Sequence, residues 1–130
     1  MRRSLLPRMG VALFTTLLSQ YATAGQDENS DFYDVRELYN TCSVAPDSAE
    51  YAVATHACLA FIGGAVQYHD AVSDRKHLKR LICYPKGATV TDGRAAFVAW
   101  GEKNLANKER MDEIAVIGLV RALAEKYPCR

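Results

Sequence analysis

The sequence has little net charge and no long hydrophobic stretch. Its 130 residues carry 16 lysines and arginines against 15 aspartates and glutamates, a formal net charge of +1. This balance argues against a nucleic-acid-binding protein, which would present a basic patch or stripe. The apolar run at residues 9–18 is shorter than the roughly 20 residues that a transmembrane helix needs. We therefore predict no nucleic-acid partner and no permanent membrane anchor.

Recognisable catalytic and metal-binding motifs are also missing. No nucleophile elbow, glycine-rich phosphate loop or paired metal-binding histidines occur. No two cysteines have the C-x-x-C spacing of a zinc site, and none of the three histidines has ligand spacing to a cysteine. Ser73, His69 and Asp70 could supply a hydrolytic set, but neighbouring residues on one helix are expected to point in different directions. We predict no catalytic, cofactor-binding or metal-binding residues, and a protein that is not an enzyme but acts by binding.

What is present begins with an export signal in residues 1–24. Three arginines among the first eight residues give a positively charged start, a short apolar run follows, and Ala22-Thr23-Ala24 has the small-residue cleavage pattern. We predict cleavage after Ala24, which leaves residues 25–130 as one domain with a net charge of −2. No cysteine follows the apolar run at the cleavage point, so a lipoprotein anchor is not expected.

Four cysteines lie downstream of this signal. Because disulfides persist in oxidising compartments, an even number of cysteines in an exported chain predicts a two-disulfide framework. Each disulfide would add roughly 2–4 kcal/mol by restricting the unfolded state, which matters for a domain with a modest core. The four residues are Cys42, Cys58, Cys83 and Cys129.

Four helices and no convincing strands are predicted. Apolar residues recur at three- and four-residue spacing, which indicates amphipathic helices. We expect helices at about 31–42 with Asp31 as the N-cap, at about 49–73, from a cap at Thr89 or Thr91 to about 104, and at about 111–127. Residues 74–80 are rich in lysine and arginine, and we interpret them as a solvated connector.

Small residues predict where helices approach each other closely. Gly63-Gly64 lies inside the second helix, where each glycine costs about 1 kcal/mol relative to alanine. We predict a close helix contact there, because glycine has no side chain to hold two backbones apart. The fourth helix has a predicted core face of large side chains and a second, smooth face for another close contact. The core face consists of Ile114, Ile117, Val120, Leu123 and Tyr127, and the smooth face consists of Ala115, Gly118 and Ala122.

The order of the helices favours one disulfide pairing. The last two helices are joined by a short connection and should be antiparallel, which brings Cys129 beside Cys83. Cys42 ends the first helix, and Cys58 lies early in the helix that folds back over it. Of the three possible pairings, we predict Cys42–Cys58 with Cys83–Cys129. The expected fold is all-α, a small four-helix domain of two helical hairpins stapled by two disulfides.

Three short motifs follow each other along the chain. They are CLAFIGG at residues 58–64, CYPKGAT at 83–89 and KYPC at 126–129. Together with Cys42 they resemble the Rap1a/Tai family of type VI secretion immunity proteins. The chain departs from that family's pattern at Ala60 and Phe61, where glycine and tyrosine are usual, and the connection after the third helix lacks the customary proline.

The resemblance implies a periplasmic, mostly helical and often dimeric protein that binds a secreted peptidoglycan amidase and occludes its active site. Loops on rigid scaffolds often carry recognition, so we predict the partner surface in the polar connection between the last two helices, with a plain solvated turn as the alternative. The predicted partner-binding residues are Asn104, Asn107, Lys108, Glu109 and Arg110. Three other functions remain open, namely a periplasmic acid-stress chaperone, an enzyme with an unrecognised site, and a protein that binds another exported partner.

Overall fold

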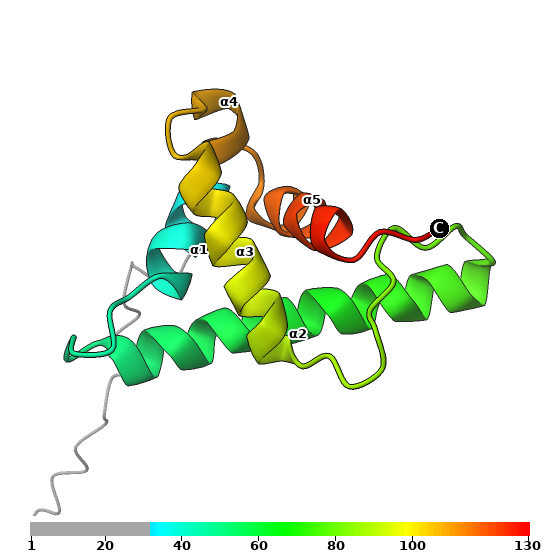
Figure 1. Ribbon diagram of the computed structural model, residues 1–130, viewed down its shortest axis with the longest axis horizontal. Helices are drawn as coiled ribbons and strands as arrows, with labels where there is room; N and C mark the ends of the chain where they lie inside the picture. The colour runs from blue at the N-terminus through cyan, green and yellow to red at the C-terminus, as the bar shows by residue number, and fades with distance from the viewer. Residues whose placement is uncertain (1–31) are drawn as a thin grey trace, which may run out of the picture.

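A computed structural model describes residues 32–130 of the protein. In this range the chain forms five helices and no strand (Figure 1). The predicted signal peptide, its cleavage after Ala24 and the proposed N-cap Asp31 lie outside the described residues. The helices are α1 (Val35–Cys42), α2 (Tyr51–Lys76), α3 (Val90–Asn104), α4 (Lys108–Met111) and α5 (Ala115–Lys126). None of them combines the length and hydrophobicity needed to cross a membrane.

The predicted all-α class is confirmed, with one additional turn of helix. The four predicted helices correspond to α1, α2, α3 and α5, while α4 lies in what was expected to be a plain connection. The first helix begins at Val35, later than predicted, because the Asp34 side chain accepts the Glu37 N–H at 2.8 Å and caps the helix there. The predicted cap of the third helix is confirmed at Thr89, which forms a reciprocal capping box with Asp92.

The long helix α2 forms one side of the molecule and the other helices gather against it (Figure 1). Helices α1, α3 and α5 contact one another, and α2 packs against α1 and α3. Leu123 in the last half of α5 approaches Gly93 in the first turn of α3, as expected for an antiparallel pair. One face of α2 therefore meets the core, and no other helix within residues 32–130 covers the opposite face.

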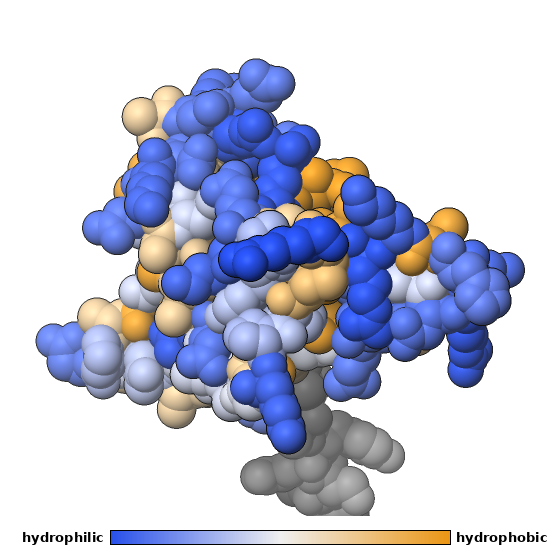
Figure 2. Space-filling view, turned by 45° about the vertical axis from the view of Figure 1, so that its right-hand side comes forward, coloured by the Kyte–Doolittle hydropathy of each residue, from blue (hydrophilic) through white to orange (hydrophobic). Residues whose placement is uncertain are grey.

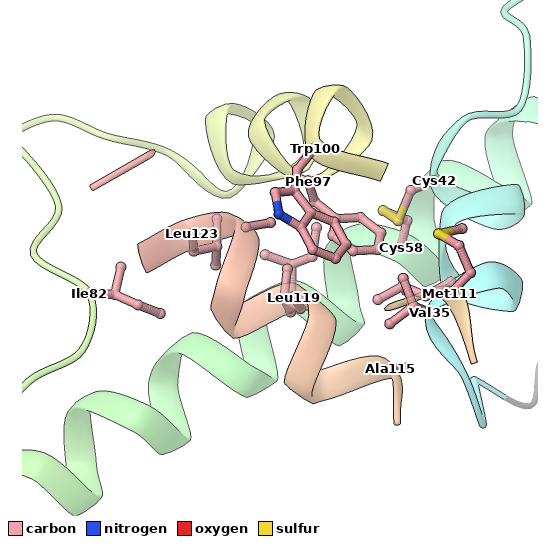
Figure 3. Close-up of a cluster of buried hydrophobic side chains, with 13 residues drawn as sticks. Val35, Cys42, Cys58, Ile82, Phe97, Trp100, Met111, Ala115, Leu119 and Leu123 are labelled. Atoms are coloured by element: carbon pink, nitrogen blue, oxygen red, sulfur yellow. A yellow bond between two sulfur atoms is a disulfide. The ribbon is translucent and has the colours of Figure 1, made fainter. Parts of the chain in front are cut away.

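The hydrophobic core lies where α1, α3 and α5 meet (Figure 3). Leu38, Phe97 and Leu119 are completely buried there, and Ile62 contributes from α2. The rings of Phe97 and Trp100 stack with centroids 6.4 Å apart. Met111 is also fully buried, so the short helix α4 is attached to the same core.

Both predicted disulfides are confirmed. Cys42–Cys58 is buried and joins the end of α1 to α2, with the two Cα atoms 5.2 Å apart. Cys83–Cys129 lies nearer the surface, with a Cα separation of 5.0 Å, and joins the segment before α3 to the end of the chain. The Cys83 N–H also donates to the Tyr127 carbonyl at 2.9 Å.

The predicted close contact at Gly63-Gly64 is wrong. A Cβ atom added at Gly64 would meet nothing within 4 Å, and one at Gly63 would make only an ordinary contact with Val90 at 3.9 Å. Close approach occurs instead at Gly101 and Gly118, where an added Cβ would collide with Tyr39 and Val35, respectively. The smooth face predicted for the last helix is thus a real packing surface, against α1.

The predicted core face of the last helix is only partly correct. Leu123 is buried as expected, and Val120 and Tyr127 are partly buried against the core. Ile114 and Ile117 are exposed instead. Because Gly118 lets Val35 approach the α5 backbone, the helix turns its small residues inward and leaves these two isoleucines outside.

Candidate functional site

All five predicted partner-binding residues lie together where α3 ends and α4 begins, at the end of the molecule farthest from α2 (Figure 1). The turn has well-defined backbone geometry. The Asn107 N–H donates to the Asn104 carbonyl at 2.8 Å, and the Asn107 side chain accepts the Arg110 N–H at 3.2 Å. Buried Met111 fixes the turn to the core. This connection is therefore a rigid, capped element.

The five residues divide into two roles. The Asn104 side chain donates to the Trp100 carbonyl at 2.8 Å, so both asparagines satisfy backbone groups at helix ends. Lys108 and Glu109 are exposed, and Arg110 is partly exposed. The asparagines thus shape the turn, and the side chains of the other three residues lie at its surface.

Ion pairs connect this turn to α1 and α5. Lys108 Nζ lies 2.9 Å from Asp112, and Arg36 of α1 lies 3.5 Å from the same carboxylate. The hydrogen bond from Lys108 lowers the pKa of Asp112, and Arg36 adds to this effect. Arg121 of α5 binds Glu113 through two hydrogen bonds of 2.9 and 3.0 Å. The geometry of the turn is therefore set by charged as well as apolar contacts.

Three apolar side chains, those of Tyr33, Ile114 and Ile117, are exposed near this turn, and we refer to them together as the apolar patch. The exposed fractions of Tyr33 and Ile114 are 71% and 65%. Backbone hydrogen bonds fix these residues in place. The Ala115 N–H donates to the Tyr33 carbonyl at 3.3 Å, and Asp34 and Ile114 form an isolated antiparallel β-bridge. Sequence reasoning missed it by assigning the isoleucines to the core. The sequence did contain an opposing indication, because the spacing of Ala115, Gly118 and Ala122 predicts a second face of the helix that could be buried in place of the isoleucines.

A second surface feature is a groove of about 500 Å³ between α3 and α5. Its lining combines alanines and Trp100 with polar and charged residues, among them Asp92, Lys103 and Glu125. The Trp100 indole N–H is already used, since it donates to Glu125 at 3.1 Å. The groove is thus an open surface depression of mixed polar and apolar character, without an evident reactive group.

The hydrolytic set considered from the sequence is only partly assembled. His69 Nδ1 lies 2.9 Å from Asp70, so the expectation that these neighbours point apart is wrong. However, His69 Nε2 accepts the Leu81 N–H at 3.2 Å, and Ser73 is buried. The nitrogen that a general base would use is therefore occupied. Among residues 32–130, no group of three or more potential metal ligands comes together.

Comparison with known proteins gives one match. A family model described as Rap1a immunity proteins matches residues 34–129. The match begins at the N-cap of α1 and ends at the last disulfide cysteine, so it spans all five helices. No curated protein and no solved structure matches the chain.

Proposed function

We propose a specific role from one established premise: this chain belongs to the Rap1a immunity protein family, and so it is an immunity protein. Its proposed target is a peptidoglycan-cleaving amidase delivered by type VI secretion. The protein binds this amidase in the periplasm and occludes its active site, with no chemistry of its own. The observation that carries the proposal is the family match, and the rigid turn at α4 supplies the surface.

Two features make the α4 turn a suitable inhibitory surface. Because the turn is already fixed by caps, ion pairs and buried Met111, little conformational freedom is lost when it enters a cleft. Lys108, Glu109 and Arg110 would form polar contacts, and the neighbouring apolar patch would be removed from water. Apolar centres with polar rims are typical of protein interfaces.

The test is the triple variant Lys108→Ala/Glu109→Ala/Arg110→Ala. We expect inhibition of the cognate amidase to weaken at least about tenfold, because a few residues usually carry most of the binding energy. A matched control is Asp74→Ala/Arg75→Ala/Lys76→Ala at the end of α2, which also removes two cations and one carboxylate. Peptidoglycan hydrolysis measured against inhibitor concentration gives both values. Unchanged inhibition by the α4 variant would refute the site.

The proposed location follows from the export signal. We propose that residues 1–24 are removed and that a single domain, residues 25–130, remains in the periplasm. Mass spectrometry of the protein from a periplasmic fraction should give a chain that begins at Gly25. A chain retaining Met1 would overturn this proposal.

The outer face of α2 is the proposed contact in a homodimer. No Asp, Glu, Lys or Arg occurs between Glu50 and Asp70, although much of this stretch is exposed. Val53 and Tyr68 are each 72% exposed, and Gly64 faces open space. An uncharged helix face with large exposed apolar side chains is normally covered by another surface. Gly64→Glu should therefore lower the mass measured by sedimentation equilibrium from that of a dimer to that of a monomer.

Two alternatives are less well supported. An acid-stress chaperone needs carboxylates that become protonated at mildly low pH, whereas hydrogen bonds from Thr89 and Lys108 lower the pKa values of Asp92 and Asp112, respectively. A different exported partner would be revealed by a pull-down from periplasm. Protection of unfolded client proteins at acid pH would favour the chaperone over the immunity role.

A further inference from the structure

The C-terminal end of α2 and the segment after it form a distinct region, the α2 tip, which comprises residues 74–86. In Figure 1 this end of α2 extends past α3 and α5. His77 adopts a left-handed conformation with φ 51°, and the Leu78 N–H donates to the Ser73 carbonyl at 3.0 Å. This pattern is a Schellman turn. The chain is thereby turned sharply at the outermost part of the molecule.

The α2 tip is strongly basic. It contains five lysines and arginines and a single acid, Asp74, whereas the rest of residues 32–130 has eight cations and eleven acids. Arg80 pairs with Asp74 at 2.8 Å and with Asp70 at 3.5 Å. The other four cations have no ion-pair partner within the described part of the chain. They are Arg75, Lys76, Lys79 and Lys86.

Two leucines are exposed among these cations. The exposed fractions are 56% for Leu78 and 57% for Leu81. An apolar residue at the position of Leu78 in a Schellman turn usually packs back on its helix. The segment is nevertheless well attached, since His69 accepts the Leu81 N–H and Arg80 binds two α2 carboxylates. The exposed leucines therefore lie on a fixed scaffold. Figure 2 shows hydrophobic side chains scattered among the hydrophilic ones on the face turned toward this end of the molecule.

We propose that the α2 tip docks reversibly on the anionic surface of a lipid bilayer. Lysines and arginines near such a surface are attracted by its negative potential, and exposed leucines can enter the boundary between headgroups and acyl chains. The acidic remainder of the chain is repelled, so only the tip faces the membrane. The outward leucines favour a bilayer over an anionic polysaccharide, which offers no apolar phase to receive them. The α4 turn lies at a different end of the molecule and stays accessible.

Co-sedimentation with lipid vesicles tests the charged part of the proposal. The protein should bind vesicles of phosphatidylethanolamine and phosphatidylglycerol, should not bind phosphatidylcholine alone, and should be largely released by high salt. Arg75→Ala/Lys76→Ala/Lys79→Ala should weaken binding at least about tenfold, because each cation near the surface contributes measurably. The matched control Lys103→Ala/Lys108→Ala/Arg110→Ala removes three cations elsewhere and should retain binding. Equal loss in the two variants, or no loss in the first, would overturn the proposal.

A second variant tests the leucines. Leu78→Ser/Leu81→Ser keeps every charge and should remove the fraction of binding that survives high salt. Both side chains are exposed, so an unchanged thermal melt is expected and checks that the variant is folded. The same proteins should also be tested on isolated peptidoglycan. If the protein binds peptidoglycan but not vesicles, and the leucine variant binds peptidoglycan equally well, the α2 tip binds a polymer and the membrane proposal is refuted. Because no amidase is present in these assays, their outcome is independent of the proposed inhibitory function.

Discussion

Glycines inside α5 and α2 have opposite surroundings. Gly118 of α5 lies directly against Val35, with no space for a side chain, whereas Gly64 of α2 faces open space and neighbouring Gly63 has only an ordinary contact. The two helices therefore use glycine differently. In α5 it allows helix α1 to approach the backbone, and in α2 it lies on or near a face that none of the five described helices covers. Glycine in a helix thus indicates close packing only where its face is buried.

The largest expected loss of stability comes from the side of α2 that packs against the core. Replacing both buried cysteines, Cys42→Ala/Cys58→Ala, opens a loop with a sequence separation of 16. The loss of this restriction on the unfolded state should cost about 3 kcal/mol, and the lost packing adds to it. Urea unfolding of the variant measures the change. A stability within experimental error of the parent protein would show that α2 is held by its apolar contacts alone.

Gly118→Ala should also destabilise the protein. Alanine favours a helix by about 1 kcal/mol over glycine, but overpacking in a core costs about 1–3 kcal/mol. Because the added Cβ would collide with completely buried Val35, we expect the second effect to dominate, with a net loss of up to about 2 kcal/mol. Urea unfolding is again suitable. Greater stability than the parent would show that α1 can move away from α5 at little cost.

The capping box of α3 lies on an exposed helix end, and we expect its loss to have a smaller effect on stability than the two changes above. Thr89→Ala removes the acceptor for the Asp92 N–H, and the loss of such a cap typically costs about 1 kcal/mol. Thr89→Ser retains the hydroxyl and serves as the matched control. The two melting temperatures should differ clearly. Equal melting temperatures for the two variants would indicate that the Asp92 side chain is sufficient to cap the helix.

Gly64→Ala is the same chemical change as Gly118→Ala, but we expect it to raise the free energy of unfolding instead of lowering it. The new methyl group meets nothing within 4 Å, so the gain in helix propensity of up to about 1 kcal/mol should be retained. The measurement is made at low protein concentration, where self-association through α2 contributes little. A loss of stability in this variant would mean that Gly64 contacts another copy of the chain even under those conditions.

The smallest effect is a dependence on acid pH. Because their partners lower the pKa values of Asp92 and Asp112 in the folded state, these carboxylates stabilise the fold above their unfolded pKa of about 3.9. This stabilisation is lost as the pH falls through the lower folded pKa values. The melting temperature should therefore change little between neutral pH and about pH 5 and fall below about pH 4. Asp112→Asn should reduce that fall.

Sequence patterns were sufficient for four of the five helices, for the cap of α3 and for the disulfides. The three- and four-residue spacing of apolar residues indicated α1, α2, α3 and α5, and Thr89 was recognised as a cap. The short connection after α3 made that helix antiparallel to α5, and this order led to the correct pairing of Cys83 with Cys129. These features depend on residues close in sequence or on chain connectivity, which the sequence states directly.

The candidate site could be predicted only in outline. The polar connection was found from its composition, but the capping role of Asn107 depends on the one-turn helix α4, which four residues of sequence do not specify. The apolar patch was missed because Ile114 and Ile117 fit a core face by spacing alone. Likewise, the contact of His69 with Leu81 joins positions twelve residues apart, and no local pattern predicts it.

By itself, the sequence determined an all-α, doubly cross-linked domain with the marks of an immunity protein. Periodicity specifies that a helix has an apolar stripe, but α5 has two candidate stripes, and α2 is free of charged side chains over most of its length. Only the tertiary structure decided which stripe is buried. The physical reason is contact between distant residues. Val35 fits over Gly118, which turns Ile114 and Ile117 outward, while no atom of the described residues lies within 4 Å of a Cβ added at Gly64.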